Sequence, residues 1–173
     1  MGDKMYKIET IRLGFVPITI EALEAAAELG EQGLEQFLGL KIIKGFIEPI
    51  HKERIFPIRM EKLRKDPEIS KWYGFVVEKE THKVVGMMGY KSPPDEKGFV
   101  EIGYGIHRRF QGLGYASEMA QALRDWAFLQ PDVKAITATN ILNDNHSSIK
   151  IVEKIGMELI QRNENTMDYI VYK

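Results

Sequence analysis

The sequence predicts a mixed α+β fold, in which runs of β-strands are interrupted by helices. Residues 100–106 alternate large apolar side chains with an acid and glycines, which is the period of two of a strand with two different faces. A glycine turn and a long helical pattern follow this strand directly. Two apolar segments separated by a short polar turn at residues 80–82 predict a β-hairpin upstream.

The N-terminal part is predicted to contain one strand and two well-marked helices. Ile8 to Phe15 has the pattern of a first strand. Thr19 is a suitable N-cap for a helix that runs through Leu29 and ends at Gly30. Phe56 to Lys65 is a second helix, with Pro57 at its start. The segment between them has no clear period and is interpreted as a short helix and a loop.

The middle of the chain is predicted to form three consecutive antiparallel strands. Trp72 to Val77 and Lys83 to Tyr90 form the two arms of the hairpin. The second arm is almost continuously apolar, as in a central strand that is covered on both faces. A proline-rich loop then leads to the strand that begins at Val100.

The C-terminal part is predicted to contain three strands and one helix. Ala135 to Thr139 is rich in residues that favour strands, and Ser147 to Ile155 has a helical apolar stripe that ends before a glycine. Met157 to Gln161 and Thr166 to Tyr172 follow as two strands around a polar turn.

The turn between the strand at Val100 and the long helix is predicted to bind an anion. Gly112 and Gly114 allow a sharp turn and leave the backbone amides uncovered. A helix that begins in such a turn presents unpaired N–H groups and the positive end of its dipole, which suits phosphate. Arg108 and Arg109 add positive charge beside the turn. One helix face is formed by apolar residues at steps of three and four: Leu113, Ala116, Ala120, Leu123 and Ala127.

Composition is that of an ordinary soluble globular protein, with 44% hydrophobic and 28% charged residues among 173. We therefore expect residues 1–173 to form a single domain.

A net charge of −1 argues against a dedicated nucleic-acid binder. The absence of cysteine excludes disulfides, a thiol nucleophile and cysteine-ligated zinc, and it fits a reducing compartment. Without an apolar run or a secretory pattern, the chain is expected to be cytoplasmic and not membrane-bound.

The glycine turn resembles the acetyl-CoA-binding motif of the GNAT N-acetyltransferases. Residues 109–114, Arg-Phe-Gln-Gly-Leu-Gly, fit that family's pattern Gln/Arg-x-x-Gly-x-Gly/Ala. The flanking words Glu-Ile-Gly-Tyr and Gly-Tyr-Ala resemble the branch that contains the ribosomal-protein N-terminal acetyltransferases. The resemblance implies the GNAT fold, a mostly antiparallel twisted sheet of about six to seven strands flanked by helices.

A second motif near the C-terminus supports the same resemblance. Asn145 and Ser148 fit the family pattern Asn-x-x-Ser, which is followed here by Glu-Lys-Ile-Gly-Met. From the residues alone, simple capping of a helix would explain this stretch. Val152 stands where many family members carry a tyrosine that acts as general acid, and Met157 replaces the usual aromatic residue.

The resemblance implies that acetyl-CoA is the cosubstrate and that a primary amine is the acceptor. Acetyl transfer would be direct, through a tetrahedral intermediate, and no metal is expected. Glu101 is the candidate general base, and an ordinary solvated strand residue is the alternative interpretation of it. Ser148 is the candidate that stabilises or protonates the leaving thiolate. The implied coenzyme-binding residues are Tyr104, Gly105, Ile106, Arg108, Arg109, Gln111, Gly112, Leu113, Gly114, Tyr115, Ala116, Asn145 and Ser148.

The acceptor is expected to bind under the segment from Gly30 to Asp66, and its identity stays open between a protein N-terminus and a small-molecule amine. Aromatic residues there are interpreted as core, and His51 as a surface residue. His107 and His146 lie beside the two motifs and are assigned no catalytic role. A homodimer is possible.

Two other functions are considered. A non-catalytic acyl-CoA sensor on the same fold would bind the coenzyme without transferring its acetyl group. A nucleotide-binding protein is less well supported, because Ser117 stands where the third glycine of the dinucleotide fingerprint belongs.

Overall fold

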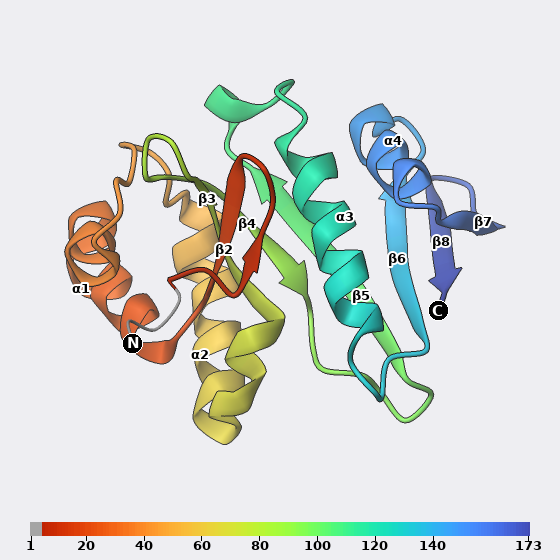
Figure 1. The fold of residues 1–173 in the computed structure, drawn as a ribbon, viewed down its shortest axis with the longest axis horizontal. Coiled ribbons are helices and arrows are strands. Elements are labelled where there is room, and N and C mark those ends of the chain that lie inside the picture. Colours follow the sequence, from red (N-terminus) through yellow and green to blue (C-terminus); the bar gives the residue numbers. More distant parts are fainter. Residues whose placement is uncertain (1–4) are drawn as a thin grey trace.

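The computed structural model describes residues 5–173, in which eight strands form one twisted sheet (Figure 1). The order across the sheet is β1-β2-β3-β4-β5-β6-β8-β7. The strands are β1 (Ile8–Glu9), β2 (Leu13–Pro17), β3 (Tyr73–Glu78), β4 (Lys83–Tyr90), β5 (Phe99–Ile106), β6 (Ala135–Leu142), β7 (Glu158–Arg162) and β8 (Thr166–Tyr172). The helices are α1 (Ile20–Leu38), α2 (Phe56–Lys65), α3 (Tyr115–Phe128) and α4 (His146–Lys154).

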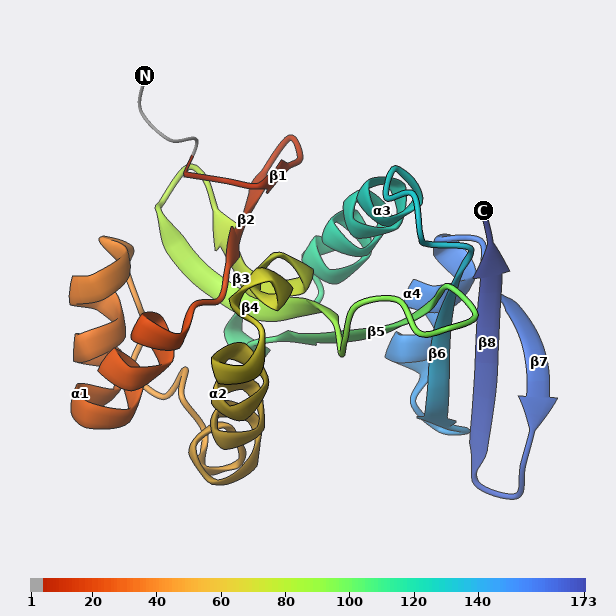
Figure 2. The ribbon, with the colours of Figure 1, turned by 90° about the horizontal axis from the view of Figure 1, so that it is seen from below.

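Helices cover both faces of the sheet, so the molecule has three layers (Figure 2). On one side, α1 and α2 pack on β3 and β4 through residues such as Leu23, Leu63 and Phe75. On the other side, α3 and α4 share a second apolar cluster with β4, β5, β6 and β8. Central strand β4 belongs to both clusters, which confirms the prediction from its continuous apolar sequence.

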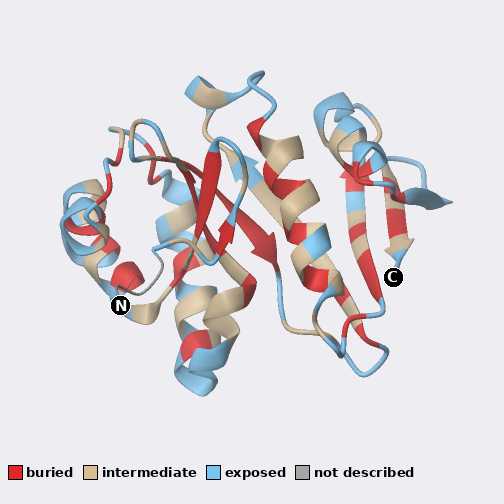
Figure 3. Ribbon diagram, viewed as in Figure 1, coloured by how far each residue is buried: buried red, intermediate tan, exposed pale blue. Residues whose placement is uncertain are grey.

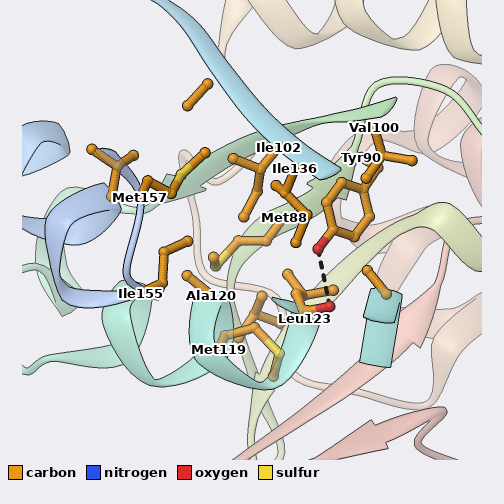
Figure 4. Close-up of a cluster of buried hydrophobic side chains, with 14 of the residues drawn as sticks. Met88, Tyr90, Val100, Ile102, Met119, Ala120, Leu123, Ile136, Ile155 and Met157 are labelled. Atoms are coloured by element: carbon orange, nitrogen blue, oxygen red, sulfur yellow. Dashed lines mark hydrogen bonds between the residues drawn. The ribbon is translucent and has the colours of Figure 1, made fainter. Parts of the chain in front are cut away.

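The core beneath α3 is apolar and closely packed, as the buried segments in Figure 3 and the side chains in Figure 4 show. Met119, Ala120 and Leu123 of α3 contact the sheet, and none of them is exposed. The buried Tyr90 hydroxyl of β4 donates a 2.9 Å hydrogen bond to the carbonyl of Leu123. This bond satisfies the phenol in an otherwise apolar layer and fixes α3 against the sheet.

Strand β5 has different neighbours along its two halves. Its first three residues, Phe99 to Glu101, pair in parallel with Ala135 to Thr137 of β6. Residues 102–106 pair antiparallel with β4, and over this stretch no strand of the described residues pairs with the opposite edge. The sheet therefore opens between β5 and β6 at the carboxyl end of β5.

The structure confirms a mostly antiparallel α+β sheet flanked by helices and corrects several predicted boundaries. The expected first strand, residues 8–15, is broken at Thr10 to Arg12 into β1 and β2, which pair with each other. The helix after Thr19 is interrupted at Gly30, where φ is +64°, but continues to Leu38 because Leu34 is also buried against the sheet. Thr19 caps it as predicted, since its hydroxyl accepts from the Ala22 amide.

The long helix begins two residues later than its apolar pattern suggested. Leu113 lies in the turn and is half exposed, so its place on the helix face was wrong. Tyr115 and Met119 take up that face instead and are buried. Trp72, expected to begin a strand, ends a 3₁₀ turn before β3. No helix of residues 5–173 is long and apolar enough to cross a membrane.

Two glycines on neighbouring strands offer a matched test of this packing. A Cβ at Gly86 of β4 would lie 2.3 Å from the Gly105 carbonyl oxygen, whereas a Cβ at Gly105 of β5 would have no atom within 4 Å. We predict that Gly86→Ala lowers the free energy of unfolding by about 1–3 kcal/mol. Gly105→Ala should change it by less than about 0.5 kcal/mol. Urea denaturation measures both, and equal stabilities would contradict the prediction.

Candidate active site

Most of the predicted coenzyme-binding residues line one cavity of about 670 Å³ between the N-termini of α3 and α4. The opening between β5 and β6 lies on the same side of the molecule, toward the top of Figure 1. From the predicted set the cavity is lined by Tyr104, Gly105, Ile106, Gln111, Gly112, Gly114, Tyr115, Ala116, Asn145 and Ser148. Two motifs some thirty residues apart in the sequence therefore form one site.

The glycine turn has the backbone geometry that its sequence predicts. Gly112 and Gly114 have φ of +78° and +80°, a region that most side chains disfavour, so glycine is favoured at both positions of the turn. Gly114 caps α3, and the first helical amides, from Tyr115 onward, lie beside the cavity. These N–H groups and the helix dipole make the turn a suitable site for an anion.

Arg12 supports this turn from the β1–β2 connection, a contact that no local pattern of residues predicts. Its guanidinium donates to the Leu113 carbonyl at 3.0 Å and pairs with Glu118 in the first turn of α3 at 2.6 Å. Thr10 and the Arg12 amide also donate to the Glu118 carboxylate. These bonds hold the pKa of Glu118 below its usual value, although its partial burial opposes the shift.

Tyr115 lies at the cavity edge but is almost fully buried. The residue is 6% exposed, and its hydroxyl donates to Glu78, which also accepts from Thr81. The two hydrogen bonds lower the pKa of Glu78, and the bond to this carboxylate raises the pKa of Tyr115. Arg12 stacks on the Tyr115 ring at 4.7 Å, so one polar cluster joins the β3–β4 hairpin to α3.

The open edge of β5 presents backbone groups to the same cavity. The Glu101 carbonyl and the His107 amide bond toward β4, so the alternate residues Tyr104 and Ile106 direct their backbone groups toward the opening. Gln111 uses this edge already, because its side-chain amide donates to the Ile106 carbonyl at 2.9 Å. An extended ligand with amide groups can pair with this edge as a further strand would.

The second motif caps α4 on the far side of the opening. Asn145 accepts a 3.1 Å hydrogen bond from the Ser148 amide, so the capping that the sequence suggested is present. The Tyr104 hydroxyl reaches across from β5 and donates to the Ser148 carbonyl at 3.3 Å. Burial raises the pKa of Tyr104 and keeps the phenol protonated. Val152 is fully buried in the core, so it carries no chemistry toward the cavity.

Some predicted residues do not line this cavity, and others were missed. Arg108 and Arg109 lie in an exposed 3₁₀ turn beside it, and Leu113 points its side chain to solvent. The missed lining residues are Phe110, Ser117, Ser147, Lys150 and Ile151. Phe110 and Ser117 lie inside or next to the first motif, and the other three share the first turns of α4 with Ser148, so helical spacing from the motifs would have found them.

Glu101 lies at the closed end of the opening, where β5 and β6 still pair. Its Oε1 accepts from Thr139 of β6 at 2.8 Å and from the Lys91 ammonium. The carboxylate is thus held by Thr139 of β6 and by Lys91, which directly follows β4. Glu101 does not line the large cavity. Its side chain lies on the same face of β5 as Gly103 and Gly105.

A second, smaller cavity of about 110 Å³ lies against Gly105 and Ile106 on the side of α1 and α2. It is lined by Phe46, Glu48, His51, Gly86, Met87 and His107 besides those two residues. The two cavities therefore share Gly105 and Ile106 of β5 in their walls. Residues 30–66 form part of its wall, as expected of an acceptor site, and Phe46 is buried there as a core aromatic.

His51 is half buried rather than a surface residue, because the Phe46 and Phe56 rings stack on it. Its Nδ1 accepts a 2.9 Å hydrogen bond from the Glu48 amide, so in the neutral ring Nε2 carries the hydrogen. Burial lowers the pKa of His51, against the opposing charge of Glu48. The ring is thus suited to donate a hydrogen bond in the cavity. Among residues 5–173, no cluster of three or more acidic or histidine side chains could hold a metal ion.

Comparison with known proteins gives a consistent result. Residues 12–158 match the family model of the acetyltransferase (GNAT) domain. The chain is 33% identical over 158 residues to an uncharacterized N-acetyltransferase of Bacillus subtilis, YjdG, covering 90% of this chain and 91% of that protein.

Solved structures share the fold at lower identity. The ribosomal-protein-S5-alanine acetyltransferase of Vibrio fischeri is 18% identical, with a TM-score of 0.61 and coverage of 94% of this chain and 92% of its own. The microcin C7 self-immunity acetyltransferase, solved with acetyl-CoA and AMP, is 14% identical, with a TM-score of 0.63 and coverage of 95% and 94%. From the family match, the 33% identical relative and the site geometry, this chain belongs to the GNAT acetyltransferase family.

Proposed function

We propose that the protein is an N-acetyltransferase that moves an acetyl group from acetyl-CoA directly to a primary amine. The observation that carries this proposal is that two cavities share Gly105 and Ile106 in their walls. One cavity has an anion-binding turn and an open strand edge, as a long phosphorylated cosubstrate requires. The other approaches the same strand from the opposite face, where an acceptor amine would enter.

Backbone groups would do most of the work of binding acetyl-CoA. The amides from Gln111 to Ala116 would hold the pyrophosphate, with Arg108 or Arg109 near phosphate. The edge of β5 at Tyr104 and Ile106 would pair with the amides of the pantetheine arm. Asn145 keeps its side-chain amide for a further hydrogen bond, because capping α4 uses only its carbonyl oxygen. This arrangement explains why the sheet opens where it does.

Glu101 would remove the proton that the amine must lose before it attacks the thioester. Acetyl-CoA supplies an activated acetyl carbonyl and a thiolate leaving group. Because Lys91 and Thr139 both bind Oε1, the proton would travel to the other carboxylate oxygen through water. A backbone N–H near Ile106 would polarise the carbonyl as negative charge develops on its oxygen.

Ser148 would stabilise the leaving thiolate, since Val152 has no group that can do so. A hydroxyl donor on α4 acts without being ionised itself.

A non-catalytic acyl-CoA sensor is the second candidate function, and it is favoured because Val152 stands where many GNAT members carry a tyrosine. It would bind acetyl-CoA but acetylate no amine. The cytoplasmic location and the homodimer stay predictions.

We predict that a negative charge placed in the glycine turn weakens the binding of acetyl-CoA. Aspartate and asparagine both tolerate positive φ and have the same shape, so Gly112→Asp and Gly112→Asn form a matched pair. Calorimetric titration with acetyl-CoA should show binding to the native protein and to the asparagine variant, and at least tenfold weaker binding to the aspartate variant. Equal affinities of the two variants would contradict the placement of the coenzyme phosphates at this turn. Titrations with NADH and ATP control for general nucleotide binding.

Arg12 is predicted to support the turn from outside. Removing its bond to the Leu113 carbonyl with Arg12→Ala should loosen the turn and weaken acetyl-CoA binding about tenfold. Arg64→Ala is the control, because Arg64 is also an exposed arginine, and its ion pair among residues 5–173 is with Glu24 on the α1–α2 side. Titration of both variants checks the effect, and an unchanged affinity for Arg12→Ala would leave the network with a structural role alone.

Glu101→Gln is predicted to separate catalysis from binding. The amide keeps the shape and can still accept from Thr139, so acetyl-CoA affinity should change less than about twofold. Without the base, kcat should fall about 10²-fold or more, and the pH–rate profile should change. Lys91→Gln removes the same ion pair but keeps the carboxylate. A profile that stays the same in Glu101→Gln would exclude the base.

A further inference from the structure

A third cavity, of about 390 Å³, lies on the acceptor side of the sheet between α2 and the end of β4. Its lining combines positive charge with apolar surface: Ile50, Arg54, Ile55, Ile58, Arg59, Lys62 and Lys91. No acidic side chain lines it. We call these seven residues the basic groove.

Most of the positive charge in the basic groove has no carboxylate to balance it. Among residues 5–173, only Lys91 of its four cations forms an ion pair, the one with Glu101. Burial lowers the pKa of Arg59, and burial together with the neighbouring Arg59 and Lys91 charges lowers the pKa of Lys62. A negative group in the groove would relieve this repulsion and replace lost hydration.

Two of these cations, Arg59 and Lys62, are also held in place before any ligand arrives. Lys62 Nζ donates to the Lys91 carbonyl at 2.9 Å and to Ser92 Oγ at 3.0 Å. Arg59 donates to the Lys91 carbonyl at 3.2 Å and stacks over the Tyr73 ring at 3.8 Å. A ligand that binds such fixed charges loses little binding energy to ordering the side chains.

The basic groove borders the place where the amine would react. The Lys91 side chain lies beside Gly103, with its Cγ 4.0 Å from where a Cβ would be, and its ammonium pairs with Glu101. His51 of the small cavity is the neighbour of Ile50 in the groove wall. The small cavity is therefore lined by Gly105 of β5, and the basic groove reaches Gly103 and the proposed base through Lys91.

We propose that the acceptor is an anionic primary amine, whose carboxylate or phosphate binds the basic groove while its amine lies at Gly103 and Gly105. The inference rests on the proposed function and names the substrate class of that same site. Ile50 and Ile58 would contact an apolar part of the acceptor between the two groups. Polyamines and aminoglycosides would be repelled, because they bring positive charge to a groove that already carries an excess of it.

The test compares acceptors that differ in charge. The panel contains a peptide with an N-terminal alanine and three glutamates, the same peptide with three lysines, phosphoethanolamine and spermidine. We expect kcat/KM for the acidic peptide or for phosphoethanolamine to exceed that for the two cationic amines at least tenfold. The better of the two anionic amines identifies a carboxylate or a phosphate as the group recognised. A preference for spermidine or the lysine peptide would overturn the proposal.

Variants on one helical segment assign the effect to the groove. Arg54 is exposed and has no ion-pair partner among the described residues, so Arg54→Glu should fold normally. It should lower kcat/KM for the preferred anionic amine about tenfold, and Arg54→Lys should restore most of it. Lys65→Glu makes the same charge change outside the groove and should have no effect. Equal losses in both glutamate variants would contradict the assignment.

A binding measurement keeps the two proposals apart. If no amine is acetylated, the proposed function fails, but titration of the acidic peptide and of phosphoethanolamine into the protein with CoA still tests the groove. Binding of either probe that Arg54→Glu weakens would support the groove as an anion site. If neither probe binds, or if Arg54→Glu leaves the affinity of the one that binds unchanged, the inference is wrong.

Discussion

The short parallel ladder between β5 and β6 is the constraint on which the site depends. Three residue pairs join the strands, and beyond Glu101 the strands diverge while β5 keeps β4 and β6 keeps β8. Backbone groups left without a strand partner must find water or a ligand. The opening therefore creates the polar edge at Tyr104 and Ile106, sets α3 and α4 on either side of it, and leaves Glu101 at its closed end.

Apolar packing positions these polar groups, and polar groups hardly enter the core. Among residues 5–173, no polar or charged residue is buried. The networks around Arg12 and Glu101 lie at the rim, where they fix local geometry without the cost of burying charge. The buried faces of α3 and β4 hold the sheet rigid, so small differences at the rim, such as the charge of the basic groove, can determine what binds.

The sequence predicted the features that depend on neighbouring residues. The turn at Gly112 and Gly114, the cap at Thr19 and the hairpin of β3 and β4 follow from local backbone preferences and periodicity. The supporting role of Arg12 was not predicted, because Arg12 lies about a hundred residues from Leu113 and no local pattern marks such a contact. The divergence of β5 from β6 and the burial of His51 also depend on pairings between distant segments. The GNAT motifs predicted residues that line the large cavity, whereas the small cavity and the basic groove came only from the structure.

The same narrow ladder has a mechanical consequence. β6, β7, β8 and α4 form one part of the molecule. It is joined to the rest by three residue pairs between β5 and β6, by the apolar core that α3 and α4 share, and by side-chain bonds such as Glu101–Thr139 and Tyr104–Ser148. A cosubstrate lying across the opening would touch both parts, and its binding energy would then resist their separation. The amides of β6 just beyond Thr137 should therefore exchange with solvent more slowly in the bound protein, which would make the cosubstrate a brace between the two parts as well as a reactant.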